Sequence, residues 1–171
     1  MTTDEADRLM QAFSTRATSS TTAKLDILLD LERLADPRVV PFLVEVLGDR
    51  REAREVRSHI LKRLRSGHPS AATRLLVSEA MLQVLSDDSS PELRLQAALA
   101  LGEFADLAGV PAALGALAVD TALPVDLRYS AFTSLERAGP TAECVALLRQ
   151  LAADETLGRS AHNVLSAWQL A

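Results

Sequence analysis

Apolar residues recur along the chain at helical spacing, in clusters that end at acidic turns. Four such clusters predict helices over residues 39–47, 75–85, 110–117 and 145–151, because side chains three, four and seven positions apart share one helical face. Asp49, Asp87 with Asp88, Asp120 and Asp154 follow them. The apolar positions are Val39, Leu43, Val46 and Leu47; Leu75, Leu76, Met81, Leu82 and Leu85; Val110, Leu114 and Leu117; and Val145, Leu148 and Leu151.

A column of basic residues marks the helices expected between those clusters. Its members are Lys24, Arg57, Arg94 and Arg128, at intervals of 33, 37 and 34 residues. An apolar residue follows each member by three positions and a leucine by seven, which predicts one buried helical face repeated in register. The two apolar columns are Ile27, Ile60, Ala97 and Ala131, and Leu31, Leu64, Leu101 and Leu135. Ala161 and Leu165 continue them and put Gly158 at the basic position, as expected of an atypical terminal repeat.

The joints between helices also repeat. Ala35-Asp36-x-x-x-Val40-Pro41 recurs 70 residues later as Ala105-Asp106-x-x-x-Val110-Pro111, which fits two units of about 35 residues. Before the repeats, residues 1–13 read as a short amphipathic helix, and the Ser/Thr-rich run from Ser14 to Thr22 reads as a linker. We therefore expect an N-terminal helix and linker over residues 1–22 and a repeat domain over residues 23–171.

These repeats resemble the HEAT-repeat family, in particular its short bacterial, armadillo-like form. The motif Leu93-Arg94-x-x-Ala97-x-x-x-Leu101-Gly102 and its partial copy from Leu127 to Leu135 are similar to the family's second helix. The resemblance covers roughly residues 23–171, while the signatures of tetratricopeptide and ankyrin repeats are missing. It implies an all-α fold, a right-handed α-solenoid of about four to five antiparallel helix pairs that binds a partner along its concave face.

Composition supports helices. Only 4% of the residues are aromatic, and leucine and alanine outnumber the β-branched residues that strands prefer. The single cysteine excludes an internal disulfide and favours a reducing, cytoplasmic setting. No basic targeting segment opens the chain, and no apolar run is long enough to span a membrane.

Candidate chemistry is sparse, so we expect no enzyme, no cofactor and no metal site. His59 and His68 are nine residues apart, not four, and His162 falls in the column of Leu61, Ala98 and Phe132, which predicts a packed core side chain. Cys144 stands on a patterned helix with no nearby His or Lys, as a small buried residue would. A lyase-type enzyme on a HEAT scaffold is kept as an alternative, on fold analogy alone.

One helical face carries apolar residues where charge is usual. The positions one and five after the basic column include Leu25 and Leu29, Leu95 and Leu99, and Tyr129 and Thr133. The N-terminal helix could cover the first pair. A partner peptide or helix with apolar anchors and acidic flanks would fit a strip flanked by the basic column. Ordinary packing of a Leu-rich chain is an equal alternative. The predicted partner-binding residues are Lys62, Leu95, Leu99, Tyr129 and Thr133.

Charge is unevenly distributed along the chain. Eight Lys or Arg and two Glu lie between Arg50 and Arg74, while residues 86–171 hold five basic and eleven acidic residues. A helical wheel places four cations on one side, opposite Val56, Ile60 and Leu64, and this basic patch comprises Arg51, Arg54, Lys62 and Arg65. A solvated face explains this patch best, and an acidic protein partner is the next alternative. Binding of phosphate or nucleic acid comes last, because interleaved aromatic residues are missing.

Overall fold

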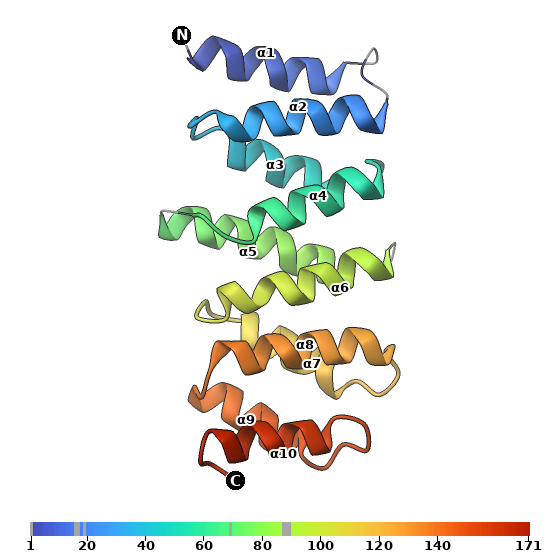
Figure 1. The fold of residues 1–171 in the computed structure, drawn as a ribbon, viewed down its shortest axis with the longest axis vertical. Helices are drawn as coiled ribbons and strands as arrows, with labels where there is room; N and C mark the ends of the chain where they lie inside the picture. Colours follow the sequence, from blue (N-terminus) through green and yellow to red (C-terminus); the bar gives the residue numbers. More distant parts are fainter. Residues whose placement is uncertain (1, 16–17, 19, 69, 87–89) are drawn as a thin grey trace. The chain divides into compact units, whose positions relative to one another are not determined.

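The chain folds entirely into helices over the residues that the computed structural model describes, which are 2–15, 18, 20–68, 70–86 and 90–171. This part of the chain contains ten α-helices and one short 3-10 helix, η1 (Figure 1). Their bounds are α1 Thr2–Ser14, α2 Thr21–Arg33, α3 Val39–Gly48, α4 Arg54–Leu64, α5 Ala71–Ser86, α6 Pro91–Ala100, η1 Leu101–Phe104, α7 Val110–Val119, α8 Val125–Ala138, α9 Ala142–Leu151 and α10 Gly158–Ala167. The predicted all-α class is confirmed. Among the described residues, no helix is both long and apolar enough to cross a membrane.

The chain forms two compact units, residues 1–80 and residues 81–171, and the boundary falls inside α5. In the first unit, α2 packs against both α1 and α4, and α3 packs against α4. The predicted apolar face of α3 is confirmed, since all four of its members are buried. From the two apolar columns, Leu31, Ile60 and Leu64 are buried, while Ile27 is half-buried.

The N-terminal helix is an integral part of the first unit. The Phe13 ring at the end of α1 meets the Phe42 ring of α3 edge to face, with centroids 5.5 Å apart. Asp7 of α1 pairs with Arg38, which also binds Asp36 in the turn before α3. Ser20 caps α2, which begins at Thr21. Thr21 and Thr22 therefore belong to this helix rather than to the predicted linker. The linker residues 16, 17 and 19 lie outside the described part.

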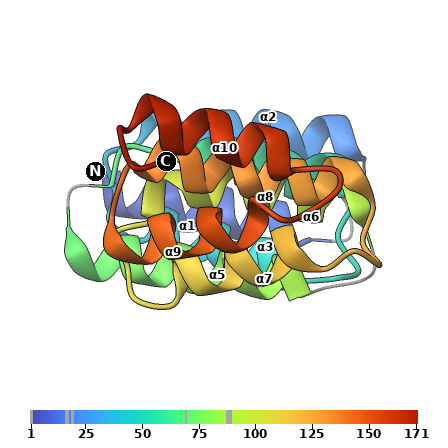
Figure 2. The ribbon, with the colours of Figure 1, turned by 90° about the horizontal axis from the view of Figure 1, so that it is seen from below.

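In the second unit, α8 packs against α6 and α7, and α9 packs against α7 and α10. The helices α6, α8 and α10 lie side by side in one layer, with α7 and α9 in a second layer (Figures 1 and 2). Leu101, Leu135 and Leu165 point into the space between the layers, where they are at most 3% exposed. The leucine column predicted from the sequence is therefore a buried spine in this unit.

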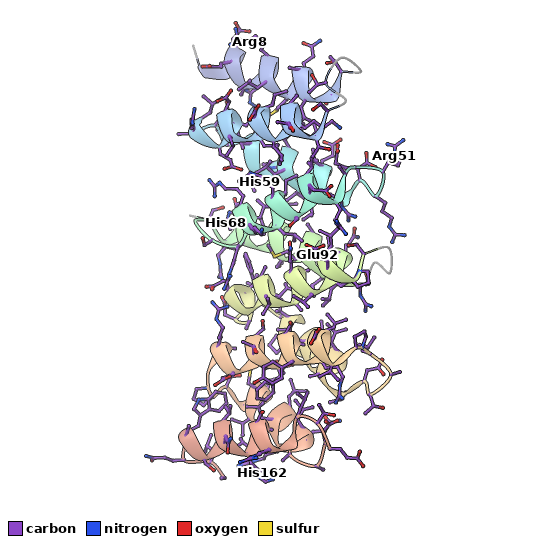
Figure 3. All side chains as sticks on the ribbon, turned by 45° about the vertical axis from the view of Figure 1, so that its right-hand side comes forward. Arg8, Arg51, His59, His68, Glu92 and His162 are labelled. Atoms are coloured by element: carbon purple, nitrogen blue, oxygen red, sulfur yellow. The ribbon has the colours of Figure 1, made fainter. Side chains whose placement is uncertain are left out.

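Two predicted core positions are wrong. Leu75 is 49% exposed because the buried face of α5 is built from Val77, Met81, Val84 and Leu85, and Leu75 lies about 120° from Met81 at 100° per residue. His162 is exposed on α10, although its counterparts Leu61, Ala98 and Phe132 are buried (Figure 3). The buried residues of α10 are Gly158, Ala161, Val164 and Leu165, and His162 lies outside this face.

Gly158 explains why the basic column ends at α10. A Cβ atom at this buried position would lie 2.7 Å from the main-chain oxygen of Ala152, so the start of α10 can approach the end of α9 only with glycine. The absence of a side chain there is a packing requirement.

We expect Gly158→Ala to destabilise the protein by about 1 to 3 kcal/mol, because the clashing atom belongs to the main chain and cannot move freely. Gly48→Ala is the matched control, since a Cβ atom at Gly48 meets nothing within 4 Å. Urea denaturation followed by far-ultraviolet circular dichroism measures both. Equal midpoints for Gly158→Ala and the unmodified protein would contradict the close approach.

Candidate functional site

Four of the five predicted partner-binding residues lie on two adjacent helices of the second unit. Leu95 and Leu99 are on α6, and Tyr129 and Thr133 are on α8. The fifth, Lys62, is exposed on α4 in the first unit. The structure therefore brings the apolar candidates together as a group without Lys62.

Small residues allow α6 and α8 to pack closely. The Ser134 hydroxyl, which is fully buried, donates to the main-chain oxygen of Ala98 at 2.6 Å. A Cβ atom at Gly102 would lie 3.1 Å from the same hydroxyl. The two helices run in the same direction (Figure 1), so Leu95 and Leu99 correspond in position to Tyr129 and Thr133.

The outer surface of these helices exposes large apolar side chains. Val125 is 52% exposed and Tyr129 is 50% exposed, one helical turn apart on α8, while Leu95, Leu99 and Thr133 are half-buried. The Tyr129 ring packs against the Phe132 ring, with centroids 5.7 Å apart. The sequence reasoning missed Val125, although its position four residues before Tyr129 places it on the same face. We call Leu95, Leu99, Val125, Tyr129 and Thr133 the apolar strip.

The corresponding apolar pair in the first unit is less well covered than expected. Helix α1 packs against α2, yet Leu29 is 44% exposed and Leu25 is half-buried. The expectation that α1 covers both residues is therefore wrong for Leu29, which leaves α2 with a single exposed leucine.

The arginines of the basic column point inward and bind the ends of neighbouring helices. In each case Nε donates to the main-chain oxygen one residue before the end of the preceding helix: Arg57 to Leu47 at 2.8 Å, Arg94 to Leu85 at 2.8 Å, and Arg128 to Ala118 at 2.9 Å. The last main-chain carbonyls of a helix have no hydrogen-bond partner within the helix, and they form the negative end of its dipole. A guanidinium supplies both a donor and a positive charge at this end. We call Arg57, Arg94 and Arg128 the arginine column.

Lys24 and Arg128, the first and last members of the basic column, also bind carboxylates in turns of other repeats. Arg128 pairs with Asp154 in the turn before α10, and both side chains are almost fully buried. Lys24 pairs with Glu52 in the turn before α4, with Nζ 2.7 Å from Oε2. These pairs connect one helix pair to the next within each unit.

Aspartates organise the turns, as the sequence pattern predicts. Asp49, Asp120 and Asp154 each accept a hydrogen bond from the main-chain nitrogen two residues later. Asp154 also accepts from the nitrogen of Leu157, and this bond, with those of Thr156 and Arg128, lowers the pKa of the Asp154 carboxyl against the effect of burial. The corresponding Asp87 and Asp88 lie outside the described residues.

Because the arginine column is buried, its charges do not favour acidic flanks on a partner. Arg128 is only 3% exposed, and Arg94 is half-buried and bonded to Leu85. The N-terminal ends of the same layer expose the carboxylates of Glu92 on α6 (Figure 3), Asp126 on α8 and Glu155 before α10. Arg159 in the first turn of α10 is also exposed.

The basic patch is dispersed and mostly paired. Arg51 lies in the turn before α4 rather than on its helical face, and it pairs with Asp49 at 3.0 Å (Figure 3). Arg54, the first residue of α4, lies 3.5 Å from Glu55. Lys62 is exposed and Arg65 is half-buried, and the predicted opposite face of Val56, Ile60 and Leu64 is indeed buried. Carboxylates thus neutralise part of the patch.

Reactive groups are few in the described part of the chain. Cys144 is fully buried in α9, as its position in the pattern predicts. His59 lies 2.7 Å from a carboxylate oxygen of Glu32, which also faces Arg63, so this histidine joins α4 to α2. No group of three or more potential metal ligands occurs among the residues with a described position.

Comparison with known proteins adds no family assignment. No protein-family model matches the chain, and no curated protein matches it in sequence.

We expect Arg128→Met to lower the free energy of unfolding by about 3 kcal/mol, because it leaves the buried Asp154 carboxylate without its cation. Trp168, the single tryptophan, lies in the second unit, so its fluorescence during urea denaturation reports the change. Arg159→Met is the control, because Arg159 is exposed on α10 and such substitutions change stability by less than about 0.5 kcal/mol. A similar effect of both variants would refute the stabilising role of the arginine column.

Asp154 also gives the stability a pH dependence of known sign. Since folding lowers the pKa of Asp154, its contribution is complete above the unfolded pKa of about 3.9 and is lost as the pH falls through the lower folded pKa. We expect Asp154→Asn to be less stable than the unmodified protein at pH 7, with a difference that shrinks steadily below about pH 4. Urea titrations from pH 7 to pH 2.5 measure this difference, and a constant gap would contradict the assignment.

Proposed function

We propose that the chain is a non-catalytic, HEAT-like scaffold that binds a partner protein along the concave face of a right-handed α-solenoid. Contacts inside each unit support this architecture, because α2 packs against α4, α6 against α8 and α7 against α9, as stacked helix pairs require. The arginine column supports it further, since three successive second helices bind their first helices in the same way. A cytoplasmic location is part of the proposal and fits the reduced Cys144.

The apolar strip is the proposed binding surface, and the exposure of Val125 and Tyr129 is the observation that carries the proposal. Two large apolar side chains, each about half exposed, lie one turn apart on α8, and the half-buried Leu95 and Leu99 lie on the adjacent α6. An amphipathic helix or extended peptide with apolar anchors would bury them. Since the buried Ser134 hydroxyl bonds α8 to α6, the surface is preorganised and binding costs it little entropy.

Charge favours basic residues beside the partner's apolar anchors. Residues 81–171 contain five arginines and eleven acidic residues, and Arg128 and Arg94 are turned inward. Glu92, Asp126 and Glu155 are exposed at the ends of α6, α8 and α10 where a bound segment would pass. Complementary charges would set the direction of the bound segment and speed its association.

Binding of nucleic acid by the basic patch has weaker support. Such binding needs cations free to neutralise phosphates, whereas Arg51 and Arg54 face carboxylates within ion-pair distance. A lyase-type activity lacks any arrangement of reactive groups in its favour, so the scaffold is the function that the described surfaces support best.

Site-specific photo-crosslinking in cells that normally express the chain tests the proposal. With a benzophenone amino acid in place of Tyr129, we expect a discrete protein adduct that mass spectrometry identifies, and we expect a basic amphipathic segment at its crosslinked peptide. Val125→Asp should remove the adduct, because a charge in the strip must be desolvated on binding.

The same photoreactive residue in place of Ala146, which is exposed on α9 in the other layer, is the control for random collisions. Circular dichroism establishes that every variant is folded. Adducts at position 129 that match those at position 146, or that persist in Val125→Asp, would rule out the apolar strip as the binding surface.

A further inference from the structure

A groove in the first unit, remote in sequence from the apolar strip, has the properties of a small-ligand site. It encloses about 650 Å³ where the end of α1, the start of α2, helix α3 and the turn before α4 meet. This volume falls in the range of small-molecule pockets. The lining residues used below are Phe13, Lys24, Phe42, Glu45, Asp49 and Glu52, and we call this the α1–α3 groove.

The side chain of Lys24 already places a cation in the groove. The Lys24 ammonium lies 5.0 Å from the centroid of the Phe13 ring and 2.7 Å from a carboxylate oxygen of Glu52. An aromatic face and a carboxylate are the two partners that organic cations use in proteins. Phe42, whose ring is perpendicular to that of Phe13, is a second aromatic residue in the lining of the groove.

The charged residues that line the groove carry one net negative charge, since three carboxylates face two cations. Arg51 pairs with Asp49, and Lys24 pairs with Glu52. Bonds from Arg51 hold the pKa of the Asp49 carboxyl below its usual range, so it is ionised near neutral pH. Glu45 is exposed on α3 and has no ion-pair partner among the residues that the structure describes.

The end of α3 makes this arrangement unfavourable without a ligand. Glu45 lies in its last turn and Asp49 caps it, and no basic residue occurs in that turn. Carboxylates at the C-terminal end of a helix are repelled by its dipole, and cations are favoured there. Arg57 relieves part of this by binding the Leu47 oxygen, and Arg51 pairs with Asp49. Glu45 is then the lining carboxylate that has no cation among the described residues.

We propose that the α1–α3 groove binds an organic cation, whose alkylammonium or guanidinium group pairs with Glu45 and whose alkyl chain lies on Phe42. An anionic ligand fits less well, because Lys24 and Arg51 are each paired with a carboxylate of the groove. The cation would occupy the open part of the groove beside Lys24. It would relieve the repulsion at the end of α3, so binding would also stabilise the first unit.

Titration of the isotope-labelled full chain with spermidine, followed by amide chemical shifts, tests the proposal. We expect saturable shifts at groove amides such as Ser14, Thr15 and Gly48, measured at constant ionic strength against sodium chloride. Glu45→Gln should raise Kd about tenfold, which is the loss of about 1.4 kcal/mol expected for one charged contact. Glu45 is exposed, so this variant leaves the fold intact.

Glu143→Gln is the matched control, because Glu143 is an exposed carboxylate on α9 in the other unit, and it should leave Kd unchanged. A short lysine peptide and its norleucine analogue form a second arm. Saturable binding of spermidine alone assigns a free polyamine, and binding of the lysine peptide assigns a protein side chain as the source of the cation.

Three results would overturn the proposal. They are the absence of saturable shifts with both cationic probes, an unchanged Kd in Glu45→Gln, and equal binding of the norleucine analogue.

Discussion

The hydrogen bond from an arginine Nε to the end of the preceding helix is the constraint on which the rest of the structure depends. Arg57, Arg94 and Arg128 each bind a carbonyl that its own helix leaves without a partner. Since the donor is fixed on one helix and the acceptor on the other, the bond sets the register of each helix pair. The leucine seven residues later then faces inward. Of the residues one and five positions later, Lys62 and Tyr129 are exposed, Leu95, Leu99 and Thr133 are half-buried, and Ser58 is buried.

The two ends of the basic column show what this constraint requires. Lysine lacks the planar guanidinium of arginine, and Lys24 binds Glu52 and the Phe13 ring instead of a helix end. At the other end, Gly158 has no side chain at all, and the main chain itself fills the space against Ala152. Each exception changes the contacts around that position. The first produces a groove with a bound ammonium, and the second produces a tight helix junction.

The described surfaces therefore divide the molecule by chemistry as well as by folding unit. In residues 81–171, Arg94 and Arg128 bind helix ends, and the surface carries an apolar strip with exposed carboxylates at the ends of its helices. In residues 1–80, Lys24, Arg51 and Arg54 pair with Glu52, Asp49 and Glu55, and Glu45 in the groove has no ion-pair partner among the described residues. The two proposed sites therefore differ in character, since one is an exposed apolar surface and the other is a groove with charged and aromatic residues.

The sequence alone determined the helical class, the buried leucine column and the acidic turns, because these follow from local spacing that repeats. It also placed Leu95 and Tyr129 at corresponding positions. Only the tertiary structure decided which faces are covered. Leu75 and His162 are exposed because they lie outside the buried faces of α5 and α10. Arg128 is buried because it binds Ala118 and Asp154, and the groove exists because Phe13 meets Phe42 across 29 residues of chain. Burial depends on contacts between residues distant in sequence, which no local pattern records.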